Sequence, residues 1–75
     1  MEKQITVLAA VDFDSLETKG ADMEDTYCQT VAEAKKRARY FLTEEFMNRS
    51  ESTVMLSYAQ VKVNGICVAD YFGGR

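Results

Sequence analysis

The dipeptide Asn64-Gly65 is the feature that most constrains how this chain can fold. A two-residue type I′ turn needs a positive φ at both central positions, and asparagine and glycine tolerate that conformation best. The runs 53–63 and 66–72 on either side are rich in β-branched and aromatic residues. We therefore expect a long β-hairpin whose turn lies at these two residues.

The turn also predicts which residues face each other across the hairpin. One side is mostly apolar and is expected to face the core; it pairs Val63 with Ile66, Val61 with Val68 and Ala59 with Asp70. The other side pairs Lys62 with Cys67, Gln60 with Ala69 and Tyr58 with Tyr71. Both tyrosines are therefore expected on the face that points away from the core.

A single amphipathic helix is expected near residues 31–47. Thr30 and Glu33 fit a capping box, in which the threonine hydroxyl accepts a hydrogen bond from a backbone N–H at the helix start. The apolar residues that follow recur at three- and four-residue spacing, and they are Val31, Ala34, Ala38, Phe41, Leu42 and Phe46. This stripe should pack on one face of a sheet, and the polar stretch 48–52 should end the helix.

The N-terminal part of the chain predicts two further strands. Apolar and polar residues alternate from Gln4 to Phe13, which is typical of a strand with one buried face. Residues 14–25 lose this periodicity and predict a solvated turn or loop, and a short strand is expected at about 24–29.

Together these elements predict one α+β domain that covers residues 1–75. Its antiparallel sheet should have about four strands in a ββαββ arrangement, with the single helix on one face and the strand order left open. Residues 73–75 are expected to form a frayed tail. A domain of this size buries only about 60% of its unfolded surface, so self-association is a reasonable expectation.

The composition argues against catalysis. Histidine is absent, which removes the usual general base and the commonest metal ligand. The acidic stretch 12–17 has Leu16 where a calcium loop needs an oxygen ligand. Cys28 and Cys67 lack a CxxC neighbour, and the glycines form no phosphate loop. We expect no catalytic residue, no cofactor, no metal site and no small-molecule substrate.

Charge and hydropathy bear on partners and location. The net charge of −3 disfavours a ligand that is bound through phosphate neutralisation and suits a basic protein partner better. The chain does not start with basic residues followed by a long apolar run, and no stretch approaches about 20 apolar residues. We therefore expect a cytoplasmic protein with free thiols and no membrane contact.

The sheet face away from the helix is the most informative candidate surface. A sheet face left to solvent is mostly polar, so aromatic and small apolar side chains there predict that something covers it. The acidic segment 12–25 is expected to take part in partner binding together with this face. The predicted partner-binding residues are Tyr58, Tyr71, Cys67, Leu8, Asp12, Asp14 and Glu17.

Two alternatives stay open at this point. In the first, the exposed sheet face only mediates homodimerisation of an otherwise uncharacterised bacterial domain. In the second, the chain is an accessory protein that binds nucleic acid through a basic patch on the helix, made of Lys35, Lys36, Arg39 and Tyr40. The acidic balance of the chain makes the second alternative the less favoured.

The capped helix start Thr30–Ala38 and the turn region Val61–Ile66 give the chain a layout that resembles several small phage-encoded proteins, including some anti-CRISPR inhibitors. The resemblance is one of architecture and transfers no individual site residue. It implies a stoichiometric inhibitor that binds a nuclease complex through its surface. Our expectation is a non-enzymatic protein-binding module from a phage or other mobile element, which acts by surface occlusion.

Overall fold

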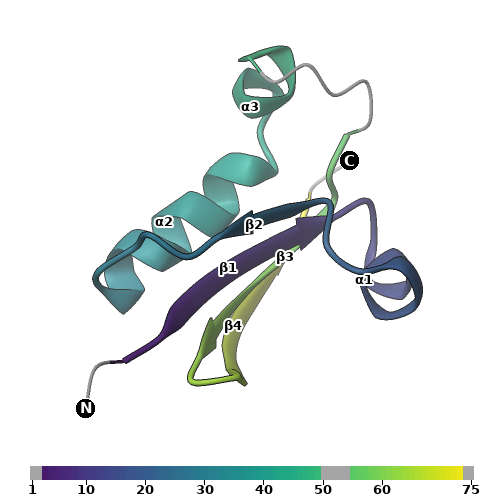
Figure 1. Ribbon diagram of the computed structural model, residues 1–75. Helices are drawn as coiled ribbons and strands as arrows, with labels where there is room; N and C mark the ends of the chain where they lie inside the picture. The colour runs from purple at the N-terminus through teal and green to yellow at the C-terminus, as the bar shows by residue number, and fades with distance from the viewer. Residues whose placement is uncertain (1–2, 50–54, 74–75) are drawn as a thin grey trace.

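The computed structural model describes residues 3–49 and 55–73, and within them the fold is α+β (Figure 1). The elements are β1 (Ile5–Ala10), α1 (Phe13–Lys19), β2 (Met23–Asp25), α2 (Val31–Phe41), α3 (Glu44–Arg49), β3 (Tyr58–Val63) and β4 (Ile66–Phe72). The four strands form one antiparallel sheet in the order β2-β1-β3-β4. The predicted fold class and four-stranded antiparallel sheet are confirmed, and the prediction of a single helix is wrong.

Helix α2 covers one face of the sheet, which we call the helix face. Ala34 and Ala38 are fully buried, and their small side chains let α2 approach β1 and β3 closely. Phe41 fills the end of this interface. The core cluster consists of Ile5, Val7, Ala9, Ala34, Ala38, Phe41, Leu56, Ala59 and Val61. The apolar stripe predicted for the helix therefore packs on the sheet as expected.

The predicted helix 31–47 is divided at Thr43. Its start is as predicted, since the Thr30 hydroxyl accepts a hydrogen bond from the Glu33 N–H at 3.1 Å. The Thr43 hydroxyl donates to the Tyr40 carbonyl at 2.7 Å and accepts from the Phe46 N–H at 3.2 Å. One side chain thus closes α2 and caps α3, which is why two helices stand where one was predicted. Residues 50–52 of the predicted helix end lie outside the described residues.

Helix α1 lies within the segment predicted as a loop. Asp12 caps it, because its carboxylate accepts a hydrogen bond from the Ser15 N–H at 2.6 Å. Gly20 ends it with a φ of 92°, and its N–H donates to the Leu16 carbonyl. Both terminal signals are present in the sequence, but seven residues are too few for a helical period to show.

The predicted turn is confirmed. Asn64 has a φ of 53° and Gly65 a φ of 86°. The Asn64 side chain also accepts from the Gln4 N–H at 2.9 Å, while the Asn64 N–H donates to the Gln4 carbonyl at 2.8 Å. The turn is therefore tied to the start of β1. The predicted hairpin began at residue 53, and residues 53–54 lie outside the described residues.

A β-bulge changes the register of the hairpin beyond its first pairs. Val63 pairs with Ile66 and Lys62 with Cys67, as predicted. The register then shifts between Val61 and Lys62, and the remaining pairs are Val61–Ala69, Gln60–Asp70, Ala59–Tyr71 and Tyr58–Phe72. The extra residue in β4 moves every later side chain of that strand to the other face. The predicted pairing of Tyr58 with Tyr71 is therefore wrong.

Gly73, predicted as the first residue of a frayed tail, is hydrogen-bonded to the neighbouring chain segment. The Gly73 N–H donates to the Ser57 carbonyl at 2.6 Å, so Gly73 continues the edge of the hairpin. A Cβ at this position would lie 3.1 Å from the Ser57 Cα, which leaves little room for a side chain. The other two residues of the predicted tail, 74 and 75, lie outside the described residues.

Candidate functional site

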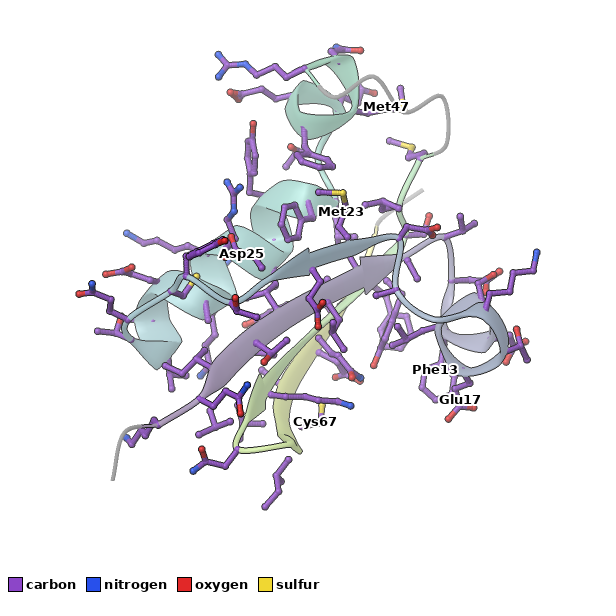
Figure 2. All side chains as sticks on the ribbon, in the orientation of Figure 1. Phe13, Glu17, Met23, Asp25, Met47 and Cys67 are labelled. Carbon is purple, nitrogen blue, oxygen red and sulfur yellow. The ribbon has the colours of Figure 1, made fainter. Side chains whose placement is uncertain are left out.

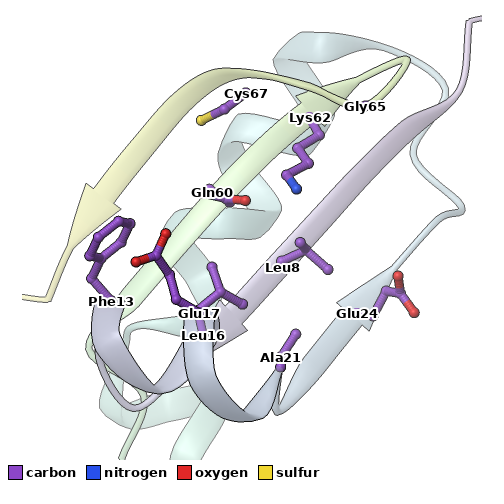
Figure 3. Close-up of a pocket in the computed structure, with 11 residues that line it drawn as sticks. Leu8, Phe13, Leu16, Glu17, Ala21, Glu24, Gln60, Lys62, Gly65 and Cys67 are labelled. Atoms are coloured by element: carbon purple, nitrogen blue, oxygen red, sulfur yellow. The ribbon is translucent and has the colours of Figure 1, made fainter.

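The sheet face opposite α2 is the candidate site, and we call it the open face. Figure 3 looks onto it, with α2 behind the sheet. The strand registers place on this face Thr6, Leu8 and Ala10 of β1, Glu24 of β2, Tyr58, Gln60 and Lys62 of β3, and Cys67, Asp70 and Phe72 of β4. Helix α1 lies over one end of it. The open face is thus covered at one end and uncovered over the rest.

Tyr58 is buried at the covered end. It is 1% exposed, although no part of α2 lies on its side of the sheet. The ring of Phe13 meets it edge-on with centroids 5.3 Å apart, and the Phe72 ring lies 5.1 Å away. Phe13 projects from the start of α1 (Figure 2). Phe13 is 44% and Phe72 70% exposed, so the two rings that cover the tyrosine form an aromatic patch at the surface.

A chain of hydrogen bonds fixes the polar groups beside this patch. The Tyr58 hydroxyl donates to the Asp70 carboxylate at 3.3 Å, and the Gln60 amide nitrogen donates to the Tyr58 oxygen at 2.8 Å. Because a carboxylate only accepts, the tyrosine proton points at Asp70 and the glutamine must present its NH₂ group. The Gln60 carbonyl oxygen is therefore the end of the amide that is directed away from the tyrosine, on the side of Lys62 in Figure 3.

The same environment affects the ionisation of the tyrosine. Burial raises the pKa of Tyr58, and the nearby negative charge of Asp70 adds to that rise, while the hydrogen bond from Gln60 opposes it. Tyr58 therefore stays a neutral donor at neutral pH. Its role in the structure is to hold Gln60 and Asp70 in place.

A groove of about 700 Å³ lies between α1 and the hairpin, and we call it the open-face groove. Its lining residues are Leu8, Phe13, Leu16, Glu17, Gly20, Ala21, Glu24, Gln60, Lys62, Gly65 and Cys67. Figure 3 shows Leu8 on the floor, with Glu17 and Glu24 on opposite sides of it. The volume falls in the range of small-molecule and peptide sites, of about 300–1,000 Å³.

Three charged side chains line this groove. Glu17 comes from α1, Glu24 from β2 and Lys62 from β3. Within the described ranges the ion pairs that lie within 4.0 Å are Arg37–Asp25 and Arg49–Glu45, and neither includes a groove residue. The charges in the groove are therefore available to a ligand.

A smaller hollow of about 360 Å³ lies on the other side of Phe13. Asp12 and Asp14 line it together with the aromatic patch of Tyr58 and Phe72. The hydrogen bond from the Ser15 N–H lowers the pKa of the Asp12 carboxyl, so this group stays charged to a lower pH than an ordinary aspartate. The end of the open face is therefore negatively charged as well as aromatic.

Charge is divided between the two sides of the molecule. Residues 12–25, which form α1 and β2 with their connections, hold six carboxylates and one lysine. One of the six, Asp25, belongs to the helix face, where its carboxylate pairs with Arg37 of α2 at 2.9 Å. Residues 31–41 of α2 hold four cationic side chains and one glutamate. The surroundings of the open face are thus acidic, and the outer surface of α2 is basic.

Most of the predicted partner-binding residues gather around the open face. Leu8, Glu17 and Cys67 line the open-face groove, and Asp12 and Asp14 line the smaller hollow. Tyr58 lies on the open face but is buried, so it does not offer the exposed ring that was predicted. Tyr71, also predicted to bind the partner, lies with Ala69 on the helix face, where both pack against the core. This is a correction to the predicted surface, and its cause is the β-bulge, which reverses the faces of the second half of β4.

The predicted basic patch does not form one surface. The Arg39 guanidinium lies 5.5 Å from the ring centroid of Tyr71 and donates to its hydroxyl at 3.4 Å, on the β4 side of α2. Lys35 precedes it by one turn and shares that side. Lys36 and Tyr40 line a hollow of about 330 Å³ next to Cys28, on the other side of the helix. The four residues therefore make two separate pairs.

The two cysteines lie on different sides of the sheet. Cys67 is exposed in the open-face groove, whereas Cys28 is half-buried beside α2. Burial raises the pKa of the Cys28 thiol, and the negative charges of Asp25 and Glu33 raise it further. Cys28 is therefore the less reactive thiol, and the pair offers one chemical probe for each side.

The sequence reasoning did not single out several residues of the site, among them Phe13, Glu24, Gln60, Lys62 and Phe72. Phe13 was assigned to the end of the first strand, because its N-capping neighbour Asp12 was not taken as a helix start. Phe72 depends on the bulge, which no local pattern in the sequence announces. Gln60 and Lys62 were placed on the correct face but were not singled out, because their importance comes from the groove that α1 creates.

Residues 3–49 and 55–73 contain no group of three cysteine, aspartate or glutamate side chains arranged to hold a metal ion. In the same part of the chain no helix has both the length and the apolar character that a bilayer crossing requires.

Comparison of the chain with protein-family models, with curated protein sequences and with solved structures finds no match.

Proposed function

We propose that this protein is a non-enzymatic binding module that acts in the cytoplasm and attaches to a protein partner through its open face. The observation that carries the proposal is the aromatic patch of Phe13 and Phe72 beside an open groove. Exposed apolar side chains that are scattered singly are ordinary, but contiguous ones next to a groove are typical of an interaction surface. The absence of histidine supports binding over catalysis.

Attachment at this face suits a mechanism of occlusion. The open face is concave at the open-face groove, aromatic at one end and acidic around α1, so a bound partner surface is shielded over that area. Such a role fits a small phage or mobile-element protein that inhibits or modulates a larger complex. The acidic surroundings favour a basic partner surface, because complementary charge speeds encounter and selects orientation.

A pair of variants of matched bulk tests the proposal. Cys67→Trp places a large neutral side chain in the open-face groove, and Ala32→Trp places the same side chain on the exposed side of α2. Each protein is immobilised, and retention of the protein that the wild type captures from producing cells is quantified. The Ala32→Trp variant should retain this partner, and Cys67→Trp should lose it. Retention of the partner by Cys67→Trp would contradict the proposal.

A further inference from the structure

We propose that the open-face groove binds a segment of the partner in which a lysine or arginine adjoins aliphatic side chains, with the cation between Glu17 and Glu24. This inference rests on the proposed function and names the chemistry that the same surface recognises. Its occupant is a basic, partly aliphatic peptide segment of another protein.

The floor and one wall favour aliphatic side chains. Leu8 lies at the centre of the groove, and Leu16 and Ala21 line the side formed by α1 and its connection to β2. These side chains offer apolar area that water covers in the free protein, and burying such area stabilises a complex by about 25 cal/mol per Å² before binding costs are subtracted. A purely polar segment would leave this area without a partner.

The walls favour a cation. The carboxylates of Glu17 and Glu24 lie on opposite sides of Leu8, and neither forms an ion pair within the described part of the chain. The Gln60 side chain, in a residue only 7% exposed, is fixed by Tyr58 so that its carbonyl oxygen is the free end of the amide. An ammonium or guanidinium group is a donor only, so these acceptors match it.

The residues around the groove also favour a cationic ligand. Asp12, Asp14 and Asp22 lie on or next to α1 and add negative charge around the groove. Among the described residues, Lys62 is the only cationic side chain that lines the groove, and it lies at the hairpin end. A phosphate-bearing ligand would meet repulsion from the acidic walls. The groove therefore discriminates by charge as well as by shape.

The edge of the sheet at β4 is another exposed surface suited to pairing. That edge carries two features that oppose the addition of another strand. The bulge after Cys67 interrupts a regular ladder, and Asp70 would bring like charges together in a symmetric pairing of two copies. The bulge and the charge of Asp70 thus favour the groove over the edge as the binding surface, and another protein over a second copy as the occupant.

The test uses labelled peptides of defined chemistry with the whole chain. One peptide alternates leucine with lysine, a second replaces lysine by glutamate, and a third replaces leucine by serine. Binding is measured by fluorescence anisotropy, and the site is located by the rate at which a maleimide modifies Cys67. We expect the first peptide to bind and to slow modification of Cys67, and the other two to bind at least about tenfold more weakly.

Charge variants of the protein make the test specific. Glu17→Gln with Glu24→Gln should weaken binding of the leucine–lysine peptide about tenfold, and Lys62→Glu should strengthen it. Glu33→Gln with Glu45→Gln makes the same change in net charge away from the groove and should leave the affinity nearly unchanged. Equal weakening by the two double variants would mean non-specific attraction and would overturn the inference.

The remaining outcomes separate this inference from the proposed function. If none of the peptides protects Cys67 while the captured partner does, the open face binds protein by another chemistry and only the inference fails. If the peptide behaves as expected but Cys67→Trp still retains the partner, the proposed function fails. Concentration-dependent dimerisation that is lost in Cys67→Trp, measured by sedimentation, would identify a second copy as the occupant and would overturn both.

Discussion

The two faces of the sheet belong to the same strands, but one is packed against a helix and the other is mostly open. On the helix face, alanines at Ala34 and Ala38 bring α2 against the valines of β1 and β3, and the interface is closed along its length. On the open face, α1 covers one end, where Tyr58 and Ala10 are buried. The rest of that face holds a groove whose three charged side chains form no ion pair within residues 3–49 and 55–73. The helix face therefore stabilises the fold, while the open face has a groove that a ligand can enter.

The largest difference in stability between the faces should appear when one phenylalanine on each face is replaced by alanine. Phe41→Ala removes a buried ring from the helix face and should lower the free energy of unfolding by about 3–5 kcal/mol. Phe72→Ala removes a ring that is 70% exposed and should cost less than about 1 kcal/mol. Urea unfolding followed by circular dichroism measures both. Similar decreases in the free energy of unfolding for the two variants would show that both faces contribute equally to stability.

Tyr58 is an exception to the contrast between a buried helix face and an exposed open face, because it is buried on the open face. Tyr58→Ala should therefore lower the free energy of unfolding by about 3 kcal/mol, although α2 does not touch it. Tyr58→Phe keeps the ring and removes only the hydroxyl, so it should cost about 1 kcal/mol. The same unfolding measurement applies. A loss for Tyr58→Ala no greater than that for Phe72→Ala would contradict the covering role of α1.

The elements of the helix face could be predicted well from the sequence, but those of the open face only in part. The apolar stripe from Val31 to Phe41 and the dipeptide Asn64-Gly65 are local signals, and each predicted its element because the period or the backbone conformation leaves few alternatives. Thr43 and Asp12 are also local signals, but each of them is a single capping residue. A cap without a long periodic segment is easily overlooked, which is why α1 and the break before α3 were missed.

The face of Tyr71 could not be predicted in the same way. A bulge adds one residue to one strand, and its position depends on how β4 packs against the whole sheet and α2. The stacking of Arg39 on Tyr71 is compatible only with the shifted register. A single displaced residue therefore removed one tyrosine from the predicted surface, while Leu8, Glu17 and Cys67 kept their places around it.

Removing the N-cap of α1 should have a smaller effect, which is confined to that helix. Asp12→Ala removes the cap of this seven-residue helix, so amide hydrogens of α1 should exchange faster while those of α2 stay unchanged. Because the folded state lowers the pKa of Asp12, its contribution is present above the ordinary aspartate pKa and is lost as the pH falls through the lowered value. Hydrogen exchange of the wild type and the variant, compared over this acidic range, measures both effects. Equal exchange in α1 would contradict the capping role.

The most direct test of the account uses the two native thiols, one on each side of the sheet. A maleimide is added to the protein alone and to the protein bound to its captured partner, and modification at each cysteine is followed by mass spectrometry. The account predicts that the partner slows modification of Cys67 strongly and leaves the slower reaction of Cys28 unchanged. Protection of Cys28 with Cys67 still reactive would place the binding surface on the α2 side and would contradict the central claim.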